Sequence, residues 1–150
     1  MGIGTHHQTV VDRLADLRPK LRRQGCYMRN QGPVTLPPYD EPEPDGAIVK
    51  GKGDDYMERH PGAAEILCVI EVADASLRRD RGYKQRVYAD NGIPVYVIIN
   101  LIDRVVELYT QPLKGTGRYG QSVTLRVKQS LTLPTARGAG LKIPVRRLLP

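Results

Sequence analysis

The chain of 150 residues carries 23 Lys and Arg against 16 Asp and Glu, which gives a formal net charge of +7. This length supports one hydrophobic core but not two, so we expect a single domain over residues 1–150. A hydrophobic fraction of 40% excludes wholesale disorder, and no apolar stretch approaches the ~20 residues that a membrane span needs. The positive charge favours a polyanionic partner but does not identify one.

The two cysteines, Cys26 and Cys68, do not indicate a disulfide framework, because Cys68 lies inside an apolar run that predicts a buried strand. Reduced thiols are typical of cytosolic proteins, and the chain begins without a signal-peptide core. We therefore expect a cytoplasmic protein that does not enter a membrane.

In chain order, residues 5–24 place Val and Leu at helical spacing between arginines, which predicts an amphipathic helix that bends or breaks at Pro19. Short strands are predicted at residues 26–31 and 34–36. A proline-rich extended segment then leads to a strand at residues 45–50.

After a polar loop, the apolar run at residues 66–73 predicts a buried strand, and residues 80–91 predict a helix that stops at Gly92. Further strands are predicted at residues 93–100, 101–109, 122–127 and 130–133, and a closing helical turn is predicted at residues 143–149. Strands that bracket one helix, followed by hairpins, predict an α/β fold with a mixed β-sheet flanked by helices. Because the run at 66–72 is apolar on both faces, that strand should be central and covered on both sides.

Two carboxylates stand at strand ends in this pattern. Alternation puts Asp45 on one face with Ala47, and Glu71 on one face with Ala73, so the two acids converge if their strands are neighbours. Close carboxylates repel unless a cation lies between them or one keeps its proton. Since Mg²⁺ prefers oxygen ligands, the pair and the backbone carbonyl of Val72 predict a metal site.

Lys84 on the following helix could direct its ammonium at this site and orient or help to deprotonate a water molecule. Simpler alternatives stay open. Glu71 could reach solvent or pair with Arg78, Asp45 could be an ordinary turn residue, and Lys84 could pair only with Asp80.

The segments "EPEPDGAIV" and "ILCVIEVADASLRRDRGYKQRVYADNGIPVYVIIN" resemble the Uma-two family of endonucleases, which belongs to the restriction-endonuclease-like PD-(D/E)xK superfamily. The resemblance implies a restriction-endonuclease-like core, with Asp45 as the first acidic ligand and Glu71 as the second. The usual lysine position of the superfamily is Ala73 here, and Lys84 is the matching lysine on the next helix. The resemblance also implies hydrolysis of phosphodiester bonds in DNA that depends on Mg²⁺ or Mn²⁺.

The chain departs from the family pattern in two ways. Relatives begin with a further segment ahead of the first helix, so we expect this chain to lack that segment, and a sheet edge left open would permit a homo-oligomer. In addition, Val95, Val97 and Asn100 stand where relatives carry Glu, Trp and Asp. These departures keep a second hypothesis open, a catalytically inactive DNA-binding or assembly module with the same fold.

Basic side chains accompany the predicted site. They could hold phosphates on either side of the scissile bond, or they could serve only in solvation and ion pairing. These residues are Arg78, Arg79, Arg81 and Arg86. His6 and His7 are better explained as a helix-start pair that forms hydrogen bonds or faces water than as metal ligands.

Overall fold

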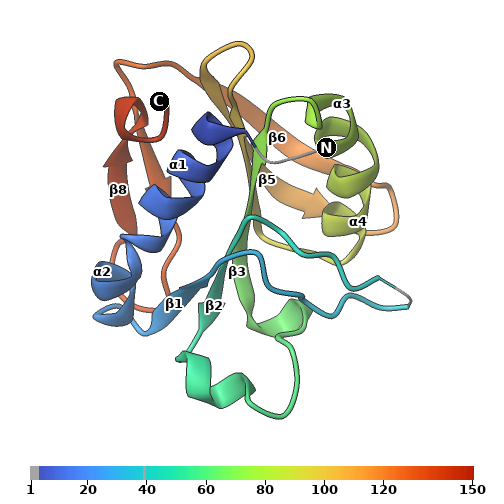
Figure 1. Ribbon diagram of the computed structural model, residues 1–150. Helices are drawn as coiled ribbons and strands as arrows, with labels where there is room; N and C mark the ends of the chain where they lie inside the picture. The colour runs from blue at the N-terminus through green and yellow to red at the C-terminus, as the bar shows by residue number, and fades with distance from the viewer. Residues whose placement is uncertain (1–3, 39) are drawn as a thin grey trace.

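The computed structural model describes residues 4–38 and 40–150. Its strands are β1 (Cys26–Arg29), β2 (Gly46–Lys50), β3 (Ile66–Ala73), β4 (Val95–Asn100), β5 (Val105–Leu113), β6 (Arg118–Leu125), β7 (Ser130–Leu133) and β8 (Leu141–Pro144). The first six form one sheet in the order β1-β2-β3-β4-β5-β6, and β7 and β8 form a separate hairpin (Figure 1). Only β3 and β4 run parallel, so the sheet is mixed, as predicted.

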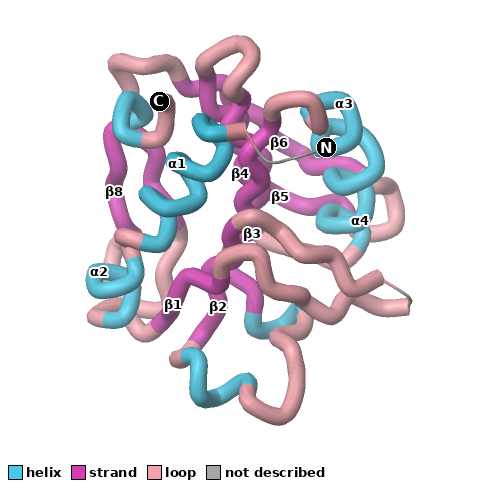
Figure 2. Tube along the Cα trace, in the orientation of Figure 1, coloured by secondary structure: helices cyan, strands magenta, loops and turns pink. Residues whose placement is uncertain are grey.

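Helices cover both faces of this sheet. The helices are α1 (Thr5–Ala15), α2 (Arg18–Arg22), α3 (Leu77–Arg79) and α4 (Gln85–Asp90), with a π-helical turn over Asp80–Lys84 that joins α3 to α4. Short 3₁₀ turns lie at Gly53–Tyr56, Ala63–Glu65 and Val145–Arg147. Figures 1 and 2 show α1, α2 and β8 on one side of the sheet and the α3–α4 segment on the other. No helix in residues 4–38 and 40–150 is long and apolar enough to cross a membrane.

Strand β3 is apolar on both faces because each face packs against its own core. Cys68 and Ile70 belong to the core that α1 closes with Val10 and Leu14. Val69 and Ala73, on the alternate face, belong to a second core that includes Tyr88 of α4, Leu77 and Tyr96. The central position predicted for this strand is confirmed, and alternation places Glu71 on the α4 side of the sheet.

Some predicted elements differ from the observed ones. Residues 34–36 form no strand and make only two isolated bridges, Thr35 to Gly62 and Leu36 to Asp40. Prolines at positions 33, 37 and 38 have no backbone N–H, which explains why a ladder does not continue there. The helix predicted over residues 5–24 is two helices, with Pro19 in the first turn of α2, and β8 was not predicted.

A buried polar cluster ties the helical segment to β5. Arg81 donates from Nε to Glu107 Oε1 at 3.0 Å, and Asn100 donates to Glu107 Oε2 at 2.9 Å. Tyr109 donates its hydroxyl to Glu107 Oε1 at 2.6 Å. Burial alone would raise the pKa of Glu107, but the hydrogen bonds from Arg81, Tyr109 and Asn100 outweigh it and hold the pKa below its ordinary value. The Glu107 carboxylate is therefore charged, and both of its oxygens accept hydrogen bonds.

Glu107→Gln should lower the free energy of unfolding by about 1–3 kcal/mol at pH 7, because it weakens this charged hydrogen-bond cluster. Since the folded-state pKa is lowered, the stabilisation is fully present above the unfolded-state pKa of about 4.3 and is lost as pH falls through the folded-state value. Urea denaturation of both proteins from pH 3 to pH 7 measures this. A stability difference that does not change with pH would contradict the assignment, and the exposed Glu58→Gln is the control.

Candidate active site

Asp45 and Glu71 meet where β2 begins and β3 ends. The antiparallel register pairs Gly46 with Ile70, so the residue before β2 lies opposite Glu71. The backbone N–H of Asp45 donates to Glu71 Oε1 at 3.3 Å, and the N–H of Val72 donates to Asp45 Oδ2 at 2.8 Å. The two residues that alternation predicted to converge therefore lie side by side, and each carboxylate accepts a hydrogen bond from the backbone of the neighbouring strand.

The π-helical turn brings Lys84 to the same place. Its Nζ lies 3.3 Å from Glu71 Oε2 and 3.0 Å from Asp80 Oδ1. The contact with Asp80 that the sequence offered as an alternative thus exists together with the contact with Glu71. Turns of this wide type are rare and occur frequently at functional sites.

Asp80 is a site residue that the sequence reasoning treated only as a surface partner of Lys84. It is fully buried, and Ser76 donates its hydroxyl to Asp80 Oδ2 at 2.8 Å. Asp80, Lys84 and Tyr88 recur at four-residue spacing, which places them on one helix face. Because Tyr88 belongs to the apolar face of that helix, this spacing was the signal that could have identified Asp80 as buried.

Glu71 is 2% exposed, and Tyr88 donates its hydroxyl to Glu71 Oε2 at 2.8 Å. The pKa of Glu71 is raised to about 7, chiefly by burial; Lys84 and the Tyr88 hydrogen bond oppose this shift, and Asp45 and Asp80 add to it. Burial alone would lower the pKa of Lys84, but Glu71 and Asp80 raise it above its ordinary value. Lys84 is therefore held as an ammonium ion.

His7, from the first turn of α1, completes the surroundings of Asp45. Its Nε2 lies 3.2 Å from Asp45 Oδ2, and its Nδ1 is buried without a hydrogen-bond partner among the described residues. Because Nδ1 has no acceptor within the described residues, the tautomer that carries its proton on Nε2 and donates it to Asp45 fits this geometry best. Asp45 Oδ2 then accepts from both Val72 and His7, while no hydrogen bond within residues 4–38 and 40–150 reaches Asp45 Oδ1.

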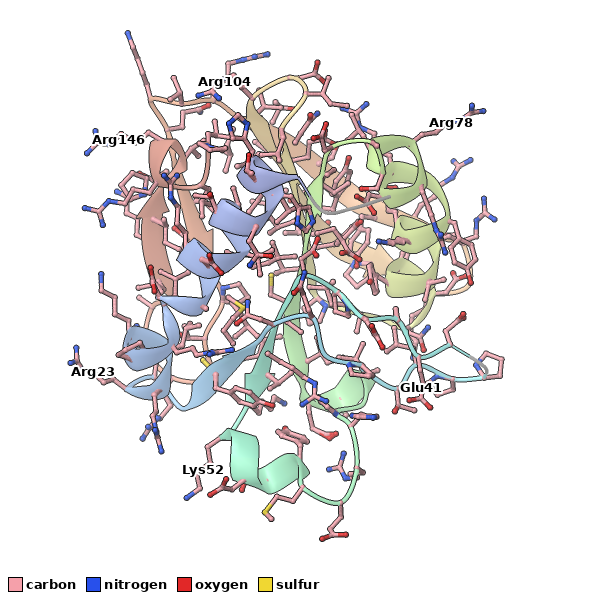
Figure 3. The ribbon with its side chains drawn as sticks, viewed as in Figure 1. Arg23, Glu41, Lys52, Arg78, Arg104 and Arg146 are labelled. Atoms are coloured by element: carbon pink, nitrogen blue, oxygen red, sulfur yellow. The ribbon has the colours of Figure 1, made fainter. Side chains whose placement is uncertain are left out.

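A cavity of about 370 Å³ opens beside these groups and is lined by Glu71, Lys84 and Tyr88. Its other polar lining residues are Asp40, Glu41, Glu43, Arg79 and Tyr83. Figure 3 shows Glu41 on the loop that leads to β2. The lining therefore holds four carboxylates against two cations, and carboxylates dominate the entrance to the site.

The four arginines predicted beside the site have different surroundings. Arg79 lines the cavity, and its guanidinium carbon lies 5.7 Å from the ring centre of Tyr83. Arg78 and Arg86 are exposed, and Figure 3 shows Arg78 projecting away from the molecule. Arg81 is held by Glu107, with Nη2 at 2.6 Å from Oε2.

The positions at which the chain departs from the family pattern lie apart from the cavity. Val97 is buried in the core on the α1 side of the sheet, and Val95 packs against that core. Asn100 is on the α4 side, where it donates to Glu107 and to Asp103 Oδ2 and accepts from the backbone N–H of Asp103. None of the three residues lines the cavity with Glu71 and Lys84.

In the part of the chain that the structure describes, no group of three or more His, Cys, Asp or Glu side chains has an arrangement ready for a metal ion. Mg²⁺ does not require such a cage, because it is usually bound through one or two carboxylates and keeps several waters. Lys84 is the one ammonium within ion-pair distance of Asp45, Glu71 or Asp80 in residues 4–38 and 40–150. The excess of negative charge and the free Asp45 Oδ1 fit a divalent cation.

Comparison with known proteins gives a family and a fold. No curated protein matches the chain. A protein from Anabaena variabilis, whose crystal structure is described as that of "a putative nuclease belonging to DUF820", has the same fold, with a TM-score of 0.71 and 12% sequence identity over 99% of this chain and 82% of that one. The model of the Uma2 family, described as "Putative restriction endonuclease", matches residues 1–146. The chain therefore belongs to the Uma2 family and has the restriction-endonuclease-like fold that its sequence implied.

Proposed function

We propose that this protein is a DNA endonuclease that hydrolyses phosphodiester bonds with the help of Mg²⁺ or Mn²⁺. The observation that carries the proposal is the contact of buried Glu71 with both the backbone of Asp45 and the ammonium of Lys84. If Lys84 served only to stabilise the fold, a single carboxylate would be enough to neutralise its ammonium. Here the ammonium is shared by Glu71 and Asp80, and Asp45 stands beside them.

In this proposal Asp45 Oδ1, Glu71 and the backbone carbonyl of Val72 hold the metal. The carbonyl is available on geometric grounds, because the N–H and C=O of one strand residue point to the same side, and the Val72 N–H points at Asp45. A divalent ion at such a site supplies charge neutralisation to a phosphate and lowers the pKa of a water molecule.

Lys84 acts as a charged donor in this mechanism rather than as a base. Its raised pKa keeps the ammonium protonated, so it can orient the attacking water by a hydrogen bond and can oppose the negative charge that grows on the phosphate. Tyr88 fixes one oxygen of Glu71, and His7 and Val72 fix one oxygen of Asp45. The carboxylates are thus oriented before substrate arrives, which is how a site lowers the cost of reorganisation.

The alternative, an inactive DNA-binding or assembly module, was suggested in part by Val95, Val97 and Asn100. Because these residues lie outside the cavity that Glu71 and Lys84 line, they leave the proposed catalytic groups complete. The cleavage assay below decides between the two functions.

Asp45→Asn and Glu71→Gln should each reduce cleavage of supercoiled plasmid by more than about 100-fold in Mg²⁺ or Mn²⁺, because each removes a charged ligand. Both proteins should stay folded by circular dichroism, and Glu58→Gln should cleave normally. Cleavage that persists in both variants, or that resists EDTA in the native protein, contradicts the mechanism. Absence of cleavage by the native protein, with DNA binding intact in EDTA, supports the inactive module.

Lys84→Met keeps the aliphatic stem and removes the charge. Cleavage should fall by about 100-fold or more, and the free energy of unfolding should fall by about 1–3 kcal/mol because two buried carboxylates lose their partner. Plasmid nicking and urea denaturation measure the two effects. The exposed Lys114→Met is the matched control, and an active Lys84→Met protein would remove Lys84 from the mechanism.

His7→Ala should weaken Mg²⁺ binding by about 10-fold to 100-fold, because Asp45 loses one of the donors that orient it. Isothermal titration calorimetry without DNA gives the dissociation constant directly. His6→Ala is the control, since His6 is the exposed neighbour on the same helical turn. Equal affinity in the two variants would show that His7 has no part in orienting the ligand.

A further inference from the structure

A second cavity, of about 600 Å³, lies where α2 and the Gly53–Tyr56 turn flank the β1 edge of the sheet. Its charged lining consists of four cations and one carboxylate, and Tyr27 supplies an aromatic wall; these are Arg18, Arg22, Arg23, Lys52, Asp54 and Tyr27. We refer to this cavity as the β1-edge hollow. Figure 3 shows Arg23 and Lys52 at this end of the molecule with their side chains directed to solvent.

The cations of the β1-edge hollow are not neutralised within the described residues. Arg22, Arg23 and Lys52 are exposed, and none of them takes part in an ion pair within residues 4–38 and 40–150. One carboxylate, Asp54, faces them. Like charges gathered around a concave surface attract a polyanion, because its binding relieves their mutual repulsion.

The β1-edge hollow is joined to the candidate active site by hydrogen bonds. Arg18 donates to the backbone carbonyl of Met28 at 3.2 Å and to Asn30 Oδ1 at 2.8 Å. Asn30 in turn donates to the backbone carbonyl of Asp45 at 3.3 Å. One wall of the hollow therefore reaches Asp45, the residue before β2.

The β1-edge hollow lies toward the opposite end of β2 from the candidate active site. Tyr27 of β1 pairs with Val49 near the end of β2, whereas Asp45 immediately precedes that strand. Duplex DNA that contacts the acidic cavity needs compensating positive surface, and the β1-edge hollow offers four cations against one carboxylate.

A second basic groove runs between α1 and β8 and has apolar walls formed by Leu17, Leu141 and Leu148. Its charged lining consists of five cations and one carboxylate, which are Arg13, Lys20, Lys142, Arg146, Arg147 and Asp16. Its lining includes no residue of β1 or of the Gly53–Tyr56 turn, both of which contribute to the β1-edge hollow. This groove therefore serves as an internal comparison.

We propose that the β1-edge hollow binds the phosphodiester backbone of duplex DNA on the flank of the bond to be cleaved. The inference rests on the proposed function, since it takes DNA as the substrate. Arg22, Arg23 and Lys52 contact phosphates, and Tyr27 offers a face on which a sugar of the backbone rests. Arg18 is a positioning residue that connects bound backbone to Asn30 and Asp45.

The test measures binding of a fluorescein-labelled duplex of random sequence in EDTA, by anisotropy over a range of salt concentrations, for the native protein, R22Q/R23Q and R146Q/R147Q. Each double variant removes two positive charges. The slope of log affinity against log salt should fall by about 2 in R22Q/R23Q, because each phosphate contact contributes about 0.9–1. The slope of R146Q/R147Q should stay within about 0.5 of native.

An unchanged slope in R22Q/R23Q, or an equal fall in both double variants, overturns the proposal. Because the assay contains no divalent metal, it does not depend on cleavage. An inactive native protein that still shows the R22Q/R23Q effect would refute the endonuclease function and support the binding surface. A native protein that cleaves DNA but shows no R22Q/R23Q effect would support the endonuclease function and refute the binding surface. Thermal unfolding of both variants should match native, since all four arginines are exposed.

Discussion

One ammonium between two buried carboxylates is the constraint on which the rest of the site depends. Glu71 and Asp80 are almost completely removed from water, and Lys84 contacts both. Burying these three charged groups costs free energy unless each charge keeps a partner of opposite sign. The loss of one partner leaves an uncompensated buried charge, which destabilises the fold. The end of β3 and the π-helical turn must therefore keep their relative positions, and this requirement links the helical segment to the sheet. Two buried tyrosines support the same arrangement. Tyr88 donates its hydroxyl to Glu71, and Tyr96 donates its hydroxyl to the backbone carbonyl of Asp80.

Much of this arrangement follows from sequence pattern. The apolar run on both faces of β3 indicated a central strand, and alternation placed Asp45 and Glu71 on facing positions, because period-two geometry leaves little choice once two strands pair. The position of Lys84 on the following helix made its contact with the site one of two alternatives, and family resemblance then matched it to the superfamily's lysine, since its spacing from Glu71 carries no helical or strand period that would by itself bring the two together.

Other features depend on tertiary packing that local pattern does not encode. His7 reaches Asp45 only because α1 crosses the end of β2, and 38 residues separate them in the chain. Asp80 resembled an exposed helix residue until Tyr88 defined the buried face. Residues 34–36 have an apolar pattern typical of a strand, but the surrounding prolines remove the donors that a ladder requires. β8 pairs only with β7, so it had no neighbour in the main sheet to suggest it.

The dual position of α1 makes the integrity of one core and the orientation of Asp45 depend on the same segment. The same helix seals one core with Val10, Val11 and Leu14 and supplies a donor to Asp45 from its first turn. Proteolytic cleavage within this helix would expose apolar surface and would also remove the His7 contact that orients Asp45. The geometry around Asp45 is thus tied to an intact amino-terminal helix, so a copy clipped there would lose the donor to this carboxylate at the same time as it exposed apolar surface.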